Sequence, residues 1–340
     1  QQEEYLSDLL NIVYREALRK EQSPAIHILK IDDPNLVLGF NNPAELLEVE
    51  KVLRDGSLKE ELPDWNPEIF QPLAAWQKFF AGISKTTSPV FQLMQKIYGN
   101  EPEIINRQGS LILEALEKFA EFNPPDSLAG IVRMPGRLNV MGRHVDHQGG
   151  NCNLMTISFE TIMLVHPRSD DLVTVRHCDD AQFPGSQFSI SELVAELPWE
   201  DWNSVITSET LMKRFREYGV AWSEYIKAAV LRLQKKFSTR PLRGMDLVVS
   251  GNIPMAAGLS SSSSLIVGAA EAAVASNALQ TFPAQLVTLC GEGEWFVGTR
   301  GGSADHAAVK MGSQGSVVKV KFFDFAVEDT VTFPESYSMV

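Results

Sequence analysis

A run of five serines is the feature of this sequence that points most directly to chemistry. It lies in residues 254–264, PMAAGLSSSSS, and an apolar stretch at helical spacing, LIVGAAEAAVAS, follows it. Small side chains let backbone N–H groups approach phosphate oxygens, and the positive end of the following helix favours negative charge. The hydroxyls of Ser260 to Ser264 can also bond phosphate or Mg²⁺. The pattern predicts a phosphate-binding loop, although a serine-rich loop before a core helix has the same composition.

Two further segments carry charged side chains that suit phosphoryl transfer, a reaction that depends on positioning and charge neutralisation. Residues 135–150 read PGRLNVMGRHVDHQGG and residues 298–306 read GTRGGSADH. In order and spacing, the three segments resemble the GHMP kinase superfamily, most closely its galactokinase-like sugar 1-kinases. The resemblance extends over residues 88–340. It implies that the first segment binds the sugar, the serine loop binds the nucleotide phosphates, and the third lies beside the reacting hydroxyl.

The resemblance implies ATP and Mg²⁺ as cofactors and Asp305 as the catalytic aspartate, which accepts or orients the proton of the attacking hydroxyl. Arg137 is its implied partner, and a guanidinium there would lower the aspartate pKa and stabilise the transferred phosphoryl group. A structural Arg–Asp pair is the alternative. Ser262 matches the metal-binding serine of the family. The residues expected to contact ATP are Gly258, Leu259, Ser260, Ser261 and Ser262.

The second Mg²⁺ ligand that the family implies, a glutamate on the helix before the third segment, is displaced in this chain. Gly293 stands where that glutamate is expected, between Glu292 and Glu294. A one-residue irregularity in the helix would restore the ligand, and we favour Glu294. The displaced glutamate also leaves open a non-catalytic protein that senses sugar and ATP, whereas the retained Arg137 and Asp305 favour an enzyme.

The sugar-binding segment departs from galactokinases, which have Glu-His-x-Asp-Tyr with the acid near the C6 hydroxyl of the sugar. This chain has Arg143, His144, Val145, Asp146 and His147 instead. The retained His144 and Asp146 are expected to read the ring hydroxyls at C3 and C4. Arginine binds a planar carboxylate through two hydrogen bonds, so Arg143 favours a uronic acid.

The string DHQGG also resembles plant galacturonate kinases, and Arg300 and Gly302 complete the predicted sugar site. Two alternatives stay open. Arg143 could pair with a protein carboxylate and leave a neutral galactose-like sugar as substrate, or the substrate could be an N-acetylated or otherwise modified hexose. The family often has glutamine at the position of His306. This histidine is expected to contact residues of the site and not the ligand itself. His27, His166 and His177 are expected to be structural.

Residues 1–56 carry a second resemblance. EEYLSDLL followed by GFNNPAELLEVE is similar to the last part of sugar-1-phosphate nucleotidyltransferases, especially the N-acetylglucosamine-1-phosphate uridylyltransferase type. The corresponding asparagine of that family, Asn41 here, helps to hold Mg²⁺. The family's glycine-rich nucleotide loop is absent, so this segment could not transfer a nucleotide alone. A helical cap on the kinase is the alternative.

The expected organisation is a nucleotidyltransferase-like segment at 1–56, a connector at 57–87 and a GHMP kinase domain at 88–340. The kinase domain is expected to be incomplete at its C-terminus, so that the remainder of a longer chain is a partner. Around the three segments the pattern predicts helices within 88–120, 210–237 and 283–298. The predicted strands are LAGIVRMPGR, ETIMLVHPRS, LVTVRHC, GMDLVVSGNIP and, in a hairpin, SVVKVKFFDF. The fold class is α/β (α+β), with a mixed sheet like that of ribosomal S5 domain 2 and an N-terminal α/β fragment.

Composition bounds the possibilities further. The 340 residues, 44% of them hydrophobic, are typical of a globular protein of about two domains. Thirty basic and 43 acidic residues give a net charge of −13, which disfavours non-specific nucleic-acid binding. The three cysteines have no paired spacing, and neither a membrane span nor a signal peptide is expected. A small sugar and ATP are therefore the expected partners, without nucleic acid or membrane, in the cytoplasm.

Overall fold

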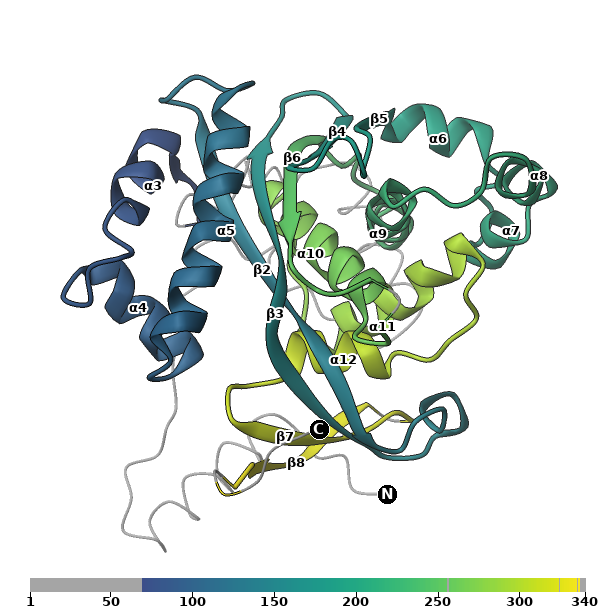
Figure 1. Cartoon of the computed structure of the whole chain (residues 1–340). Coiled ribbons are helices and arrows are strands. Elements are labelled where there is room, and N and C mark those ends of the chain that lie inside the picture. Colours follow the sequence, from purple (N-terminus) through teal and green to yellow (C-terminus); the bar gives the residue numbers. More distant parts are fainter. Residues whose placement is uncertain (1–68, 256, 324, 335, 337–340) are drawn as a thin grey trace, which may run out of the picture. The chain divides into compact units, whose positions relative to one another are not determined.

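A mixed sheet of eight strands runs through the part of the chain that the structure, a computed structural model, describes (Figure 1). That part comprises residues 69–255, 257–323, 325–334 and 336, all within one compact unit, Leu62–Val340. Asn41, the predicted nucleotidyltransferase-like segment and the first part of the predicted connector, residues 57–68, lie outside the described residues. The strands are β1 (Gln71–Pro72), β2 (Leu128–Met141), β3 (Cys152–Pro167), β4 (Leu172–His177), β5 (Ser186–Ser189), β6 (Met245–Gly251), β7 (Ser316–Lys321) and β8 (Ala326–Thr332).

The strand order is β1-β2-β3-β6-β4-β5, with β7 paired to β3 and β8 paired to β7. Strand β4 runs parallel to β6, and the other described pairs are antiparallel. The predicted mixed sheet is therefore confirmed, as is the hairpin that β7 and β8 form. The long strand β3 joins the two halves of the sheet, because its beginning pairs with β7 and its end with β6.

Helices cover both faces of this sheet (Figure 1). On one face lie α3 (Leu73–Phe80), α4 (Pro89–Tyr98) and α5 (Pro102–Ala120). On the other lie α9 (Ser223–Lys236), α10 (Ser261–Ser276), α11 (Pro283–Glu294) and α12 (Ala304–Met311), with α6 (Ile190–Glu196), α7 (Trp202–Ile206) and α8 (Glu209–Tyr218) beyond α9. The predicted helices are present, whereas β1, β5, α3, α6, α7 and α12 were not predicted. No helix among the described residues is both long enough and apolar enough to cross a membrane.

Strand β3 shows why the sheet needs both helical layers. Ile162 and Leu164 pack into the core formed with α3, α4 and α5, whereas Met163 and Val165 pack into the core on the α10 side. Side chains alternate between the two faces of a strand, so a continuous apolar run is buried on both faces. This alternation fixes β3 centrally, with its start close to the polar segments.

Helix α10 lies close against the sheet because its residues are small. A Cβ added at Gly268 would lie 2.8 Å from Cε of Met163 on β3. The helix begins at Ser261, and Ser260 precedes it in the left-handed conformation with φ of 59°. The serine run therefore opens a helix, as predicted. Backbone N–H groups of its first turn have no partner within the helix and face outward from its N-terminus.

Candidate active site

The three polar segments converge on a cavity of about 400 Å³, which we call the polar cavity. Strand β2 and the turn after it supply the first segment, the start of α10 the second, and the loop into α12 the third. The cavity thus brings together residues that lie far apart in the sequence. Its lining includes most of the predicted site residues: Arg137, Arg143, His144, Asp146, Ser262, Glu294, Arg300, Gly302 and Asp305.

Arg137 connects the serine loop to α12. Its Nε donates to Oδ1 of Asp305 at 2.6 Å, and its Nη2 donates to Oδ2 of the same carboxylate. Its Nη1 donates to the carbonyl of Gly258 at 2.5 Å, and its backbone N–H donates to the carbonyl of Leu259 at 3.1 Å. One side chain on β2 therefore orients both the phosphate loop and the predicted catalytic carboxylate.

The Asp305 carboxylate is held in its ionised form. Burial by itself raises the pKa of this group, but the ion pair with Arg137 and the hydrogen bond from Ser260 outweigh burial and lower the pKa overall. The Ser260 hydroxyl donates to Oδ2 of Asp305, so it faces the carboxylate as well as the loop. An ionised carboxylate in this position can accept or orient the proton of a hydroxyl group.

Ser262 and Glu294 meet at the other end of the polar cavity. Helix α11 ends at Glu294, and the 3₁₀ helix η3 (Trp295–Val297) follows at once. Glu294 lies beside the Ser262 side chain and 3.2 Å from Nε2 of His306. Burial raises its pKa, but the interactions with His306 and Ser262 lower the pKa overall. Glu292 faces away, since its Oε2 accepts from Nε of Arg232 at 2.8 Å. Of the two glutamates considered, Glu294 is the one that lines the cavity.

This pair of oxygen donors fits Mg²⁺ bound with a nucleotide. Mg²⁺ usually takes one or two side-chain ligands and completes its shell with phosphate oxygens and water. Ser262 and Glu294 supply two oxygen donors beside the N-terminus of α10. Across the described residues, no group of three or more histidine, cysteine or acidic side chains could hold a metal alone. A cation here would therefore depend on ligands from bound phosphate.

Asp146 connects the sugar-binding segment to the same helix that carries Asp305. It lies in the short 3₁₀ helix η2 (Asp146–Gln148), is 8% exposed, and accepts the backbone N–H of Ala304 at 3.0 Å. A Cβ at Gly302 would collide with this carboxylate, so a glycine is required there. Asp146 and Gly302 thus fix the start of α12 against the floor of the polar cavity.

Arg143 and Arg300 lie exposed at the rim of the polar cavity. Among the carboxylates that the structure describes, none forms an ion pair with Arg143. The Arg300 guanidinium lies 5.8 Å from the centre of the Trp295 ring. His144 adopts a φ of 63°, an unfavourable conformation for a residue with a side chain. The rim therefore carries two cations and a strained histidine around an open space.

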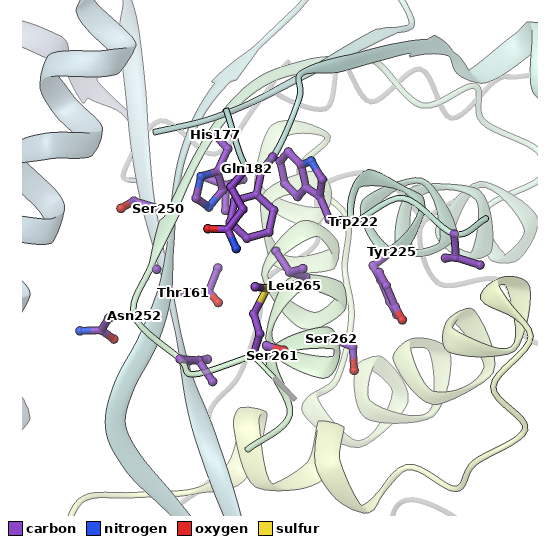
Figure 2. A pocket seen from close by; sticks show the side chains of 16 residues that line it. Thr161, His177, Gln182, Trp222, Tyr225, Ser250, Asn252, Ser261, Ser262 and Leu265 are labelled. Atoms are coloured by element: carbon purple, nitrogen blue, oxygen red, sulfur yellow. The ribbon is translucent and has the colours of Figure 1, made fainter. Parts of the chain in front are cut away.

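A second cavity, of about 460 Å³, lies on the other side of Ser262 and Tyr225, and both residues line both cavities. We call it the aromatic cavity because His177, Phe183 and Trp222 form its wall (Figure 2). The centres of the His177 and Phe183 rings are 4.3 Å apart, and those of Phe183 and Trp222 are 6.0 Å apart. Ser261 and Ser262 border this cavity at the start of α10 (Figure 2).

The sequence analysis missed most of this wall. His177 has the structural role predicted for it, since its Nδ1 accepts the backbone N–H of Asp179 at 2.9 Å, but it also faces the cavity. Burial lowers its pKa, which favours a neutral, stackable ring. Trp222 and Tyr225 stand three residues apart at the start of α9, the one pattern that could have revealed them. The two cavities together can hold a flat aromatic group, a phosphate chain and a polar ring in sequence.

Comparison with known proteins gives two domain matches: residues 224–313 match the GHMP kinases N terminal domain, and residues 117–167 match the galactokinase galactose-binding signature. The galactokinase of Candida parapsilosis is 26% identical over 212 residues, which are 61% of this chain and 38% of that protein. The galactokinase of Roseiflexus sp. (strain RS-1) is 29% identical over 211 residues, 62% of this chain and 47% of that protein. The alignments thus span less than half the length of these relatives.

Among solved structures, the chain is similar to Lactococcus lactis galactokinase in complex with galactose, with a TM-score of 0.53 and 25% identity. That alignment covers 66% of this chain and 52% of the galactokinase chain. Together with the domain matches, it confirms the predicted resemblance and fold class. The roles of single residues stay predictions.

Proposed function

We propose that this chain, which carries the N-terminal domain of a GHMP kinase and a galactokinase signature, belongs to an ATP-dependent sugar 1-kinase. The observation that carries the proposal is the paired contact between Arg137 and Asp305, at the point where the phosphate loop meets the polar cavity. A sugar hydroxyl in the polar cavity and a nucleotide in the aromatic cavity would meet beside this pair.

In this account the adenine ring of ATP lies against the aromatic wall, since flat rings gain from stacking on Trp222 and Phe183. The phosphates lie at the N-terminus of α10, where backbone N–H groups and the helix dipole favour negative charge. Ser262 and Glu294 would hold Mg²⁺, which supplies charge neutralisation on the phosphate oxygens when bound.

The acceptor is the anomeric hydroxyl of a sugar whose ring Asp146 and His144 orient. Asp305 accepts or orients the hydroxyl proton as the oxygen attacks the terminal phosphorus. Arg137 keeps that carboxylate ionised and offsets charge that develops on the transferred group. In these roles the side chains mainly position the reacting groups and neutralise charge, as expected for phosphoryl transfer.

We further propose that the sugar is a hexuronic acid. Arg143 lies at the cavity rim and has no ion pair among the described carboxylates, which supports a guanidinium reserved for a ligand. A carboxylate at C6 would satisfy it through two hydrogen bonds. Arg300 adds a second positive charge at the same rim.

The test is ADP release by the full-length protein with galactose, glucose, galacturonate, glucuronate and N-acetylgalactosamine, each at several concentrations. We expect the highest kcat/KM with a hexuronate. A preference for galactose over every uronate would overturn the carboxylate proposal and keep the kinase. If no sugar raises ADP release above the rate without sugar, the chain is a binding protein that senses sugar and ATP.

The nucleotidyltransferase-like residues 1–56 support a second activity in the same protein. A sugar 1-phosphate made by the kinase would be the substrate that such an enzyme joins to a nucleotide. We propose that Asn41 helps to hold Mg²⁺ there, in a metal site separate from the kinase site. Incubating the full-length protein with a sugar 1-phosphate and UTP tests this: release of pyrophosphate that Asn41→Ala abolishes supports the proposal, and no release overturns it.

A further inference from the structure

The glutamate of the kinase metal site stands one position later in this chain than the family pattern implies. A Cβ at Gly293 would lie 3.6 Å from the carbonyl oxygen of Ala228, so position 293 faces α9 rather than the polar cavity. Even a glutamate at that position would therefore point into the neighbouring helix. Glu294, the next and last residue of α11, lines the polar cavity instead.

His306 contacts the displaced glutamate from behind. Its ring is fully buried, at 0% exposure, and its Nε2 lies 3.2 Å from Oε2 of Glu294. Gly291 lets the two helices come this close, because a Cβ there would lie 2.8 Å from Cβ of Ser303 at the start of α12. Among the described residues, neither nitrogen of this ring has a hydrogen-bond partner. A buried imidazole needs one, and the Glu294 carboxylate lies within reach of Nε2.

Glu294 would not hold this position by itself. It ends helix α11, and the C-terminal end of a helix is an unfavourable place for a carboxylate. Its side chain also has several rotamers, and fixing one of them costs entropy. An N–H donated by the rigid, buried ring on α12 would oppose both effects. We infer that His306 is a positioning residue that holds Glu294 beside Ser262 and thereby prepares the divalent-cation site.

This inference rests on the proposed kinase function, because it concerns the cation that ATP brings. It adds a consequence: α12 carries both Asp305 and the residue that orients the metal ligand. The catalytic carboxylate and the cation site are then placed by one helix. The shift of the glutamate by one residue and the histidine after Asp305 would be two parts of one arrangement.

The test measures binding of Mn²⁺, by electron paramagnetic resonance, to the full-length protein saturated with a non-hydrolysable ATP analogue. We expect His306→Leu, which removes the donor at similar volume, to weaken Mn²⁺ binding about tenfold, the scale found when a residue that orients a metal ligand is lost. His306→Gln keeps an N–H donor and should restore most of the affinity. His166→Leu, a partly buried histidine on β3 outside both cavities, is the matched control and should bind Mn²⁺ as the wild type does.

A double-mutant cycle separates positioning from general damage. If His306 acts through Glu294, His306→Leu should weaken Mn²⁺ binding little further in a Glu294→Gln background. Additive losses, wild-type affinity in His306→Leu, or equal losses in the Leu and Gln variants would each overturn the inference alone. Failure of the wild type to bind Mn²⁺ with the analogue would instead overturn the metal site of the proposed function, and the inference with it.

Discussion

The two cavities that meet at Ser262 and Tyr225 differ in chemistry although they share a border. The aromatic cavity is walled by His177, Phe183 and Trp222, whereas three arginines and three acidic side chains line the polar cavity. The aromatic cavity would bind a ligand through the surface area of stacked rings, which many flat molecules can provide. The polar cavity would select a ligand by its charge and its hydrogen-bonding groups, which few ligands match.

This difference indicates where selectivity lies in the molecule. Substitutions in the aromatic cavity should change nucleotide affinity and leave the chemistry intact. Substitutions in the polar cavity should change turnover or the choice of sugar. The predictions below test that division, beginning with the largest expected effect.

Replacing Asp305 by asparagine should lower kcat by about 100-fold or more, the usual scale for loss of a positioned acid–base group. The amide cannot accept the hydroxyl proton, while the cavity keeps its shape. Sugar affinity, measured by calorimetry, should change little. Asp246→Asn, which affects an ion pair with Arg168 far from the site, is the control. Near-normal turnover of the Asp305 variant would remove this residue from the mechanism.

Replacing Arg143 by glutamate should lower kcat/KM for galacturonate or glucuronate at least tenfold, since a two-point charged contact contributes roughly 1.5–3 kcal/mol. The same variant should gain activity on galactose, because it restores the acidic side chain that galactokinases have there. Steady-state rates with both sugars check this. An equal loss on both would show that Arg143 supports the fold instead of selecting the sugar.

Replacing Trp222 by alanine should raise KM for ATP about tenfold, because stacking of a base on an aromatic ring is worth about 1–3 kcal/mol. KM for the sugar should stay unchanged. Trp199→Ala, in a separate apolar cavity, is a matched loss of a tryptophan and should leave both values unchanged. A rise in both KM values for Trp222→Ala would contradict the separation of the two cavities.

Replacing Arg137 by methionine should shift the pH dependence of kcat/KM. Burial raises the pKa of Asp305, and the ion pair with Arg137 reverses that shift, so wild-type kcat/KM should fall only below the ordinary aspartate range. In Arg137→Met the opposing charge is gone, burial prevails, and the acidic limb should move to higher pH. Rates measured between pH 4 and 8, about the range in which carboxyl groups and histidine titrate, check the direction. An unmoved limb would mean that another group controls it.

The contrast between the cavities also explains what could be predicted from the sequence. Nine of the fifteen residues that line the polar cavity were predicted, because Arg137, Asp146 and Asp305 stand in short strings that resemble those of a known family. The aromatic cavity was missed, because His177, Phe183 and Trp222 come from separate segments and resemble ordinary core residues. Its wall exists only once the end of β4 and the start of α9 come together, where the centres of the His177 and Trp222 rings are 5.4 Å apart.

Three features could not be predicted because they depend on local geometry: the choice of glutamate, the partner of Arg143 and the short helices. The choice between Glu292 and Glu294 depends on which side chain faces the polar cavity, and spacing alone cannot show that Glu292 pairs with Arg232 while Glu294 lines the cavity. Similarly, the absence of a described acidic partner for Arg143 is a property of its neighbours in space. The short helices α6 and α7 escaped prediction because five to seven residues carry too little periodicity.

The central claim is that Asp305 and Arg137 direct ATP to the anomeric oxygen of a sugar. The most direct measurement is ³¹P NMR of the product that the full-length protein makes from ATP and its preferred sugar. The account predicts a phosphorus signal coupled to the anomeric proton, absent with Asp305→Asn. Coupling to another sugar proton, or inorganic phosphate as the only new signal, would contradict it.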